Sequence, residues 1–278
     1  MSRTYKATGI NLKAMPLGEA DRLLTILTRE YGLVRVVAPG ARKTRSQLGG
    51  RTGLFVVNEL LIAKGRSLDK LSQAETLASY PGLSKHLATL AASQYLAELV
   101  LYQALSDQPQ DDLFCLLCER LASLETATPD QVLPLLTQSV FDLLDWGGVA
   151  PQVQACCLTQ RSLRPDLKNP DWRIGFSLAA GGTVSLDAPE LLERSPRAAE
   201  PSTQSRKPAP KPLALTAIEL ALLQQISNSG SDPNSQYPAA VWISVERLLR
   251  QYAQYYFDRP IRSAALMDSC FSPLPSVL

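Results

Sequence analysis

The sequence predicts an α+β protein, with a small β-barrel in the first 80 residues and a helical domain after it. Three observations indicate this fold class. The hydrophobic period is that of strands up to Tyr80 and that of helices after Pro81. The charge changes there too, because residues 1–80 hold 13 Lys and Arg against 6 Asp and Glu, whereas residues 81–278 hold 15 against 20. At 278 residues the chain is long enough for two domains, 1–80 and 81–278, each with its own core.

Five segments in the first domain have the pattern of strands: residues 4–14, 21–28, 33–38, 54–64 and 68–79. In the third, Leu33, Arg35 and Val37 alternate with Val34, Val36 and Ala38, as expected when one face is buried. The second and third segments are joined by Arg29-Glu30-Tyr31-Gly32, a tight turn in which Gly32 can take a positive φ. Five short antiparallel strands favour a closed barrel of the oligonucleotide-binding (OB) type, with an SH3-like barrel as the alternative.

The most distinctive segment is the basic loop, residues 39–51, which contains four cations, three glycines and no acidic residue. We interpret it as a flexible hairpin connection that follows a phosphate backbone, since Arg and Lys contact phosphates whatever the base sequence. A solvated surface loop is the alternative. The residues predicted to bind nucleic-acid phosphates across the barrel face and this loop are Arg22, Arg35, Arg42, Lys43, Arg45, Arg51, Lys64 and Arg66. Tyr31 is predicted either to stack on a base or to pack on the barrel.

Helical periods begin after Pro81, in residues 87–105, 111–124 and 129–144. Between residues 151 and 190 this period is lost, and residues 172–178 with 183–186 are typical of a small β-hairpin around Gly181-Gly182. Residues 195–212 have the composition of a flexible linker or loop, and two further helices are expected at 216–227 and 239–257, before a short tail. The linker cations either contact DNA loosely or are simply solvated; they are Arg194, Arg197, Arg206, Lys207 and Lys211.

Residues able to carry catalysis are scarce, which favours a protein that is not an enzyme. The single histidine, His86, has no triad partners that can be assigned. Residues 40–44 lack the glycine spacing of a phosphate-binding loop, and no acidic cluster has the spacing of a two-metal nuclease. The start of the chain does not resemble a signal peptide, and an odd number of cysteines, five, argues against a disulfide framework. We therefore expect a cytoplasmic protein.

Three segments of the sequence resemble the RecO family of bacterial DNA repair and recombination mediators. They are residues 18–32, with the motif Thr28-Arg29-Glu30-Tyr31-Gly32, residues 38–43, and residues 141–151, with Asp145-Trp146-Gly147-Gly148. The resemblance implies an OB barrel, a helical domain, binding of single- and double-stranded DNA and annealing of complementary strands. It also implies that the chain works with RecR and the single-strand-binding protein to load RecA.

Many relatives in that family carry a zinc module with two Cys-x-x-Cys pairs, and this sequence departs from that pattern. If Cys157 begins the first pair, its partner position is Gln160, and the second pair falls on about Ser185 and Ala188. A structural zinc site needs four nitrogen or sulfur ligands, so we predict no zinc and no other cofactor. Trp172 and Phe176 are the expected apolar replacements. Cys115 and Cys118 have the same spacing but lie in an apolar helical pattern, so we expect buried thiols there.

For the helical domain, the resemblance implies contact with the acidic, apolar tail of the single-strand-binding protein. Such a ligand needs an apolar pocket beside cations. The last long helix offers an apolar stripe that includes Tyr252, with Arg247 and Arg250 alongside, although core packing explains the stripe as well. Two functions from different classes follow: a recombination mediator that binds DNA and proteins, or a regulatory or scaffold protein whose basic barrel binds RNA or an acidic protein.

Overall fold

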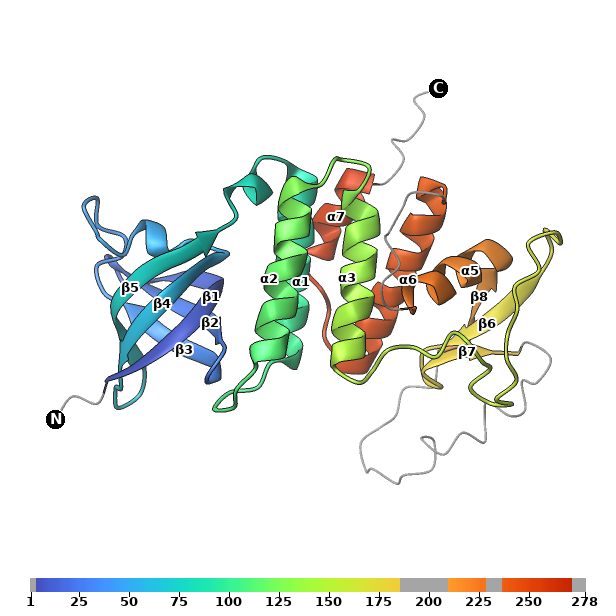
Figure 1. Cartoon of the computed structure of the whole chain (residues 1–278), viewed down its shortest axis with the longest axis horizontal. Helices are drawn as coiled ribbons and strands as arrows, with labels where there is room; N and C mark the ends of the chain where they lie inside the picture. The colour runs from blue at the N-terminus through green and yellow to red at the C-terminus, as the bar shows by residue number, and fades with distance from the viewer. Residues whose placement is uncertain (1–3, 186–209, 229–236, 272–278) are drawn as a thin grey trace. The chain divides into compact units, whose positions relative to one another are not determined.

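A computed structural model describes residues 4–185, 210–228 and 237–271 of the chain (Figure 1). The chain divides into two compact units, Met1–Thr128 with Arg262–Leu278, and Pro129–Ile261. The first unit therefore contains the barrel and part of the helical region. The domain boundary predicted at residue 80 lies inside this unit and stays a prediction.

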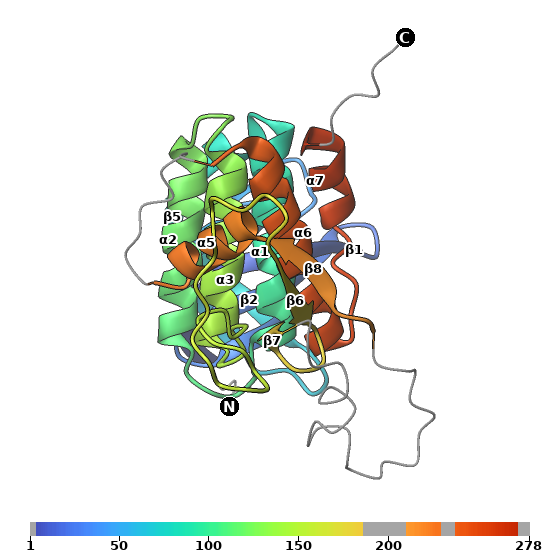
Figure 2. The ribbon, with the colours of Figure 1, turned by 90° about the vertical axis from the view of Figure 1, so that its right-hand side faces the viewer.

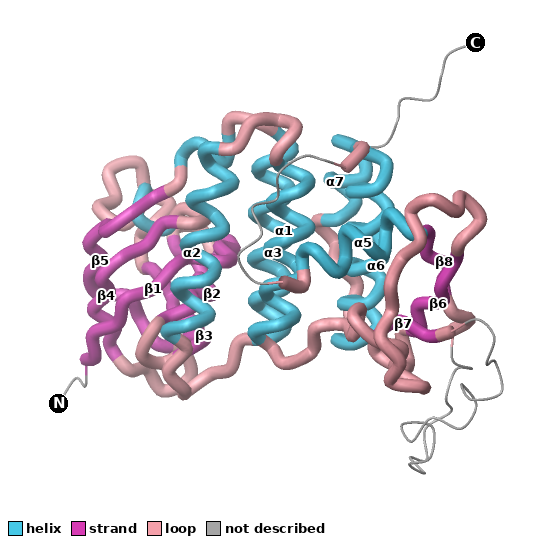
Figure 3. The backbone as a smooth tube through the Cα atoms, turned by 45° about the vertical axis from the view of Figure 1, so that its right-hand side comes forward, coloured by secondary structure: helices cyan, strands magenta, loops and turns pink. Residues whose placement is uncertain are grey.

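The first unit begins with a closed five-stranded barrel in the order β1-β2-β3-β5-β4, in which only β3 and β5 pair in parallel (Figure 3). The strands are β1 (Thr4–Leu17), β2 (Asp21–Thr28), β3 (Gly32–Ala38), β4 (Val56–Ala63) and β5 (Asp69–Ser79). All five predicted strands are confirmed, and the closed Greek-key arrangement is that of the OB fold. One interpretation was wrong: β3 and β4 are not neighbours, so the basic loop is not a hairpin connection.

The barrel is filled by the inward-facing side chains of all five strands. They form one buried cluster that includes Ala7, Leu24, Ile26, Val36, Ala38, Leu60, Ile62, Leu71 and Ala74. The alternation expected in β3 is confirmed, because Val36 and Ala38 are fully buried while Arg35 is exposed. In β1 the pairing with β2 slips between Asn11 and Lys13, so Leu12 is an extra residue. This bulge reverses the inward and outward positions of the rest of β1.

The helices of the first unit are α1 (Leu87–Gln103), α2 (Asp111–Thr126) and α7 (Ala264–Phe271), with a 3-10 turn, η2 (Pro81–Ser84), before α1. The predicted positions of α1 and α2 are confirmed. The sequence analysis missed α7, which packs on α1 and was expected to be a tail. Glu98 of α1 anchors the start of this segment, since its carboxylate accepts the backbone N–H groups of Arg262 and Ser263 at 3.0 Å each.

The second unit contains α3 (Val132–Trp146), α5 (Ala217–Ile226), α6 (Ala239–Phe257) and a small sheet of β6 (Arg173–Ser177), β7 (Gly182–Val184) and β8 (Leu213–Thr216) (Figure 2). The predicted hairpin is confirmed as β6–β7, and β8 adds a third strand on the other side of β6. Thr216 ends β8 and caps α5, because it forms a capping box with Glu219. In this unit α3 packs against α6.

Candidate nucleic-acid interface

The strand directions place the connections at two opposite ends of the barrel. The β1–β2 turn (residues 18–20) and the β3–β4 loop (residues 39–55) share one end, which we call the loop end. The β2–β3 turn (residues 29–31) and the β4–β5 turn (residues 64–68) share the other, the turn end. The predicted DNA-binding residues are therefore divided. Arg42, Lys43, Arg45 and Arg51 lie at the loop end, whereas Tyr31, Lys64 and Arg66 lie at the turn end.

Between the two ends, the outer surface of β1, β2 and β3 carries two rows of side chains. One row crosses the strands as Lys13, Thr25 and Arg35, and both cations are exposed. The next row is Met15, Leu23, Val37 and Lys70. Arg35 was predicted to lie on this face. The sequence analysis missed Lys13 and Lys70, because the bulge at Leu12 turns Lys13 outward and the β3–β5 pairing brings Lys70 beside Val37.

The basic loop is held against the barrel. Gly40 N–H donates to the Asp21 carboxylate at 2.8 Å, and Arg42 N–H donates to the Ala20 carbonyl at 2.8 Å. Farther along, the buried Asn11 amide donates to the carbonyls of Arg51 and Gly53, at 2.8 and 2.9 Å. A 3-10 turn, η1 (Gly50–Thr52), forms within it. The side chains of Arg42, Lys43, Arg45 and Arg51 are nevertheless exposed, so an anchored backbone presents them to solvent.

Arg22 differs from the other predicted cations because it is half-buried. It occupies an inward-facing position near the start of β2, opposite Ala38. Its Nη1 donates to the Thr52 hydroxyl at 2.8 Å and to the Gly49 carbonyl at 3.2 Å. Arg22 therefore ties the basic loop to β2, and its phosphate-binding role stays a prediction.

Aromatic rings and cations gather at the turn end. Tyr31 is 38% exposed, and its ring meets that of Tyr5 edge to face, with the centroids 4.9 Å apart. Lys64 places its ammonium 5.9 Å from the Tyr5 ring centroid, and Arg66 is exposed in the same turn. The Tyr5 hydroxyl donates to Asp69 at 2.8 Å, and burial together with this bond raises its pKa. Tyr31 therefore packs on the barrel and still exposes part of its ring, so both predicted roles remain compatible with its position.

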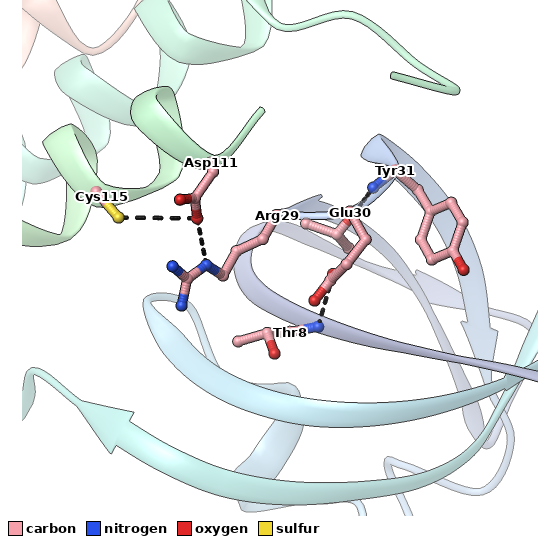
Figure 4. Close-up of polar contacts among 7 residues, drawn as sticks. Thr8, Arg29, Glu30, Tyr31, Asp111 and Cys115 are labelled. Atoms are coloured by element: carbon pink, nitrogen blue, oxygen red, sulfur yellow. Dashed lines mark hydrogen bonds and ion pairs between the residues drawn. The ribbon is translucent and has the colours of Figure 1, made fainter. Parts of the chain in front are cut away.

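The β2–β3 turn also fastens the barrel to α2 (Figure 4). Arg29 forms an ion pair with Asp111 in the first turn of α2 and lies 5.6 Å over the Phe114 ring. Glu30 accepts the backbone N–H of Thr8 at 2.9 Å. Figure 4 shows Tyr31 pointing away from Asp111. The side chains of Arg29 and Glu30 thus bond to other residues of the first unit, whereas the Tyr31 side chain points away from α2.

The outer surface of β4 and β5 has the opposite charge character. Glu59 and Glu75 lie directly across from each other on these strands, and Lys6 pairs with Glu59 at 3.2 Å. Like charges in this position repel each other and would repel phosphate. The cations on β1–β3 and the acids on β4–β5 therefore give the barrel one side suited to a polyanion.

In the second unit, the three predicted partner-binding residues of α6 lie in different environments. Arg247 is exposed, whereas Tyr252 is 4% exposed and meets Phe176 edge to face, with centroids 5.9 Å apart. Arg250 is 9% exposed and pairs with Glu246 at 3.3 Å. Core packing therefore accounts for Tyr252 and Arg250. The exposed rings of this helix are those of Tyr255 and Tyr256.

The region predicted to replace the zinc module is held by hydrogen bonds. Gln224 of α5 donates to the carbonyls of Val153 and Leu163, at 2.9 and 3.1 Å. Cys156 is buried, and its sulfur accepts the backbone N–H of Ser185 at 3.4 Å. Burial raises the pKa of this thiol, but hydrogen bonds from Thr159, Ser185 and Leu158 outweigh burial, and the net shift is downward.

These residues do not fit a structural zinc ion. Gln160 and Ser185 supply no thiol or imidazole, and no group of three or more His, Cys, Asp or Glu able to hold a metal occurs among the residues that the structure describes. Ala188 lies outside those residues, as do Arg194, Arg197, Arg206 and Lys207, whereas Lys211 is described and exposed. Phe176 is fully buried, as expected of an apolar replacement, and Trp172 is half-buried.

Two other sets of residues singled out in the sequence lie in or beside the helices of the first unit. Cys115 and Cys118 are half-buried free thiols in α2, and burial raises the pKa of Cys118 to about 11. His86 is exposed just before α1. Within the described ranges, no helix is both long and apolar enough to cross a membrane.

Comparison with known proteins agrees with the fold. Residues 1–80 match the family described as "Recombination protein O N terminal", and residues 84–265 match "Recombination protein O C terminal". The chain belongs to the RecO family. It is 65% identical to the DNA repair protein RecO of Cyanothece sp., over 99% of this chain and 98% of that protein. It is also 55% identical to the DNA repair protein RecO of Acaryochloris marina, over 100% of this chain and 98% of that protein. A role in DNA repair and recombination follows from this membership.

Proposed function

We propose that this protein is a recombination mediator that binds single- and double-stranded DNA through the basic side of its barrel and anneals complementary strands. The observation that carries the proposal is the distribution of charge. Exposed cations occur at the loop end, on the outer face of β1–β3 and at the turn end, while Glu59 and Glu75 occupy the outer face of β4–β5. A strand lying across β1–β3 would pass Lys13 and Arg35 between the cations of the two ends.

Annealing follows from the kind of contact that these residues make. Arg42, Lys43 and Arg45 carry exposed positive charges suited to phosphate oxygens, and cations bound to the phosphates reduce the repulsion between two strands. Phosphate contacts leave the Watson–Crick edges of the bases free to pair. Partial stacking on Tyr31 would orient a strand without reading its sequence. The mechanism uses no bond-making step, and we infer that the protein is not an enzyme.

The partners and location of the protein are part of the same proposal. We infer that it acts in the cytoplasm with RecR to help load RecA onto strands coated by single-strand-binding protein. All five cysteines are free thiols, which suits a reducing compartment. For the tail of the single-strand-binding protein, α6 offers the exposed cation Arg247 and the exposed rings of Tyr255 and Tyr256, which fit an acidic, apolar peptide.

The decisive experiment compares two charge-reversal variants with the same change in net charge. Reversing Arg42, Lys43 and Arg45 to Glu should weaken binding to single strands at least about tenfold and slow the annealing of coated complementary strands, because three phosphate contacts become repulsive. Reversing the exposed cations Arg161, Arg164 and Lys168 of the second unit is the matched control and should have little effect.

Equal effects of the two variants would show that only net charge matters and would contradict the proposed interface. If the wild type fails to accelerate annealing at low salt, the mediator function is wrong, and the basic side would then serve an RNA or an acidic protein.

A further inference from the structure

A hollow of about 280 Å³ opens at the loop end, between the end of β1, the start of β2 and residues 52–54 of the β3–β4 loop. One part of its lining is apolar, from Met15, Pro16 and Leu54. Met15 is 45% exposed and Leu54 is 41% exposed, so both side chains offer apolar surface to solvent. The hollow is slightly smaller than a site for a drug-sized ligand, which is typically about 300–1,000 Å³. A hollow of this volume can hold one small ring system.

Ala14, Thr52 and Gly53 also line the hollow, together with two residues that carry guanidinium groups, Arg22 and Arg42. Both are oriented by hydrogen bonds to the protein. Arg22 uses Nη1 for Thr52 and Gly49, and Arg42 uses Nη1 for the Gly18 carbonyl at 3.0 Å. A guanidinium has five N–H donors, so each group keeps donors for a ligand. A planar, oriented guanidinium can also stack on a base.

We propose that this hollow receives one unstacked nucleobase of a bound single strand. Met15, Pro16 and Leu54 would contact the base, and Arg42 would hold its phosphate. This inference deepens the proposed DNA binding and rests on it. It adds a base-binding site at the loop end, separate from the proposed stacking on Tyr31 at the turn end.

The position of the hollow favours a nucleic acid over a peptide as its occupant. Arg42 lines the hollow and also begins the exposed cations of the basic loop, Lys43 and Arg45. The nearest acids at this end are in or beside the β1–β2 turn: Glu19 is exposed, and Asp21 accepts the Gly40 N–H. A strand that follows the basic loop therefore passes the opening of the hollow with its phosphates on the cations.

The test compares two probes of equal length and charge, an oligothymidylate and an abasic phosphodiester strand. The wild type should bind the oligothymidylate about tenfold more tightly, as expected for one stacked base. Changing Met15→Ala and Leu54→Ala together should lower this ratio about fivefold by weakening only the thymidylate complex, while any stacking on Tyr31 at the turn end persists. Because both side chains are well exposed, this variant should keep the wild-type melting temperature.

Leu17→Ala is the matched control, because Leu17 is 38% exposed in the same part of β1 and lies outside the lining. It should keep the wild-type ratio. Equal binding of the two probes by the wild type, or an unchanged ratio in the double variant, would overturn the inference while leaving phosphate binding intact. If neither probe binds at low salt, the proposed DNA binding itself is wrong and this inference is wrong with it.

Discussion

Single residues show why the motif Thr28-Arg29-Glu30-Tyr31-Gly32 has its composition. The Thr28 hydroxyl donates to the Gly32 carbonyl at 2.8 Å and accepts the Tyr31 N–H at 3.1 Å, which closes the turn. Arg29 and Glu30 fasten the turn to α2 and β1. This motif of the RecO family is therefore largely a structural joint of the first unit. Within it, the exposed part of Tyr31 is available to contact DNA.

Gly32 gives the first prediction at this scale. Its φ is +64°, and an added Cβ would lie 2.0 Å from the Leu105 carbonyl oxygen. Gly32→Ala should therefore lower the free energy of unfolding by at least about 2 kcal/mol more than Gly18→Ala. Gly18 is the matched control, since its φ is +58° but nothing lies within 4 Å of an added Cβ. Urea unfolding of both variants measures the difference, and equal losses would contradict the close approach to Leu105.

At the scale of the elements, the connection between α1 and α2 docks on the β2–β3 turn of the barrel. The Leu33 N–H donates to the Leu105 carbonyl at 2.8 Å, and the Gln110 N–H donates to the Arg29 carbonyl at 2.8 Å. The Arg29–Asp111 ion pair lies beside these backbone bonds. The helical period in the sequence predicted α1 and α2, but it could not show that the connection between them docks on the β2–β3 turn, because that contact joins residues far apart in the chain.

Acid should weaken this joint in a predictable way. The hydrogen bond from Arg29 lowers the pKa of Asp111, so the carboxylate adds stability above its ordinary pKa and loses that stability as the pH falls through the lowered value. The wild type should therefore lose more stability between pH 7 and pH 3 than Asp111→Asn does. Asp112→Asn, in the same first turn of α2, controls for the helix dipole. Identical pH profiles for wild type and Asp111→Asn would show that the ion pair contributes nothing.

At the scale of the whole molecule, the distribution of charge over the surface decides whether a polyanion can bind. The formal net charge is only +2, yet exposed cations gather at the loop end, on the outer face of β1–β3 and at the turn end, while Glu59 and Glu75 lie together on β4 and β5. Steering of a polyanion depends on this local distribution and much less on the net charge. The strength of DNA binding should therefore respond strongly to salt.

The salt dependence is a quantitative prediction for the intact protein. If about four to six phosphates are engaged, log K for single strands should fall with log salt at a slope of roughly −3 to −4. The loop charge reversal should make this slope shallower, whereas the second-unit control should keep it. A fluorescence titration at several salt concentrations provides the measurement. A wild-type slope near zero would mean that phosphates are not the main contact.

Much of the fold was predictable because it depends on local patterns. Alternation predicted the strands, the 3.6-residue period predicted the long helices, and Gly32 predicted the tight turn. The helix α7 was missed because it is only eight residues long. The strand β8 was missed because it follows a segment rich in Pro and Ser. Short elements like these are stabilised by partners distant in the sequence, such as β6 for β8 and α1 for α7.

By itself, the sequence determined the fold class, the basic character of residues 1–80 against the acidic character of residues 81–278, and the presence of a basic loop. Composition and period are properties of neighbouring residues, so they can be read from the sequence. Only the tertiary structure decided where each cation lies. Strand direction places Lys64 and Arg66 at one end of the barrel and Arg42 at the other, and the bulge at Leu12 turns Lys13 outward. Burial of Arg250 and Tyr252 likewise depends on packing between distant elements. The physical reason is that a binding surface is made by pairing and packing across the chain, which no local pattern records.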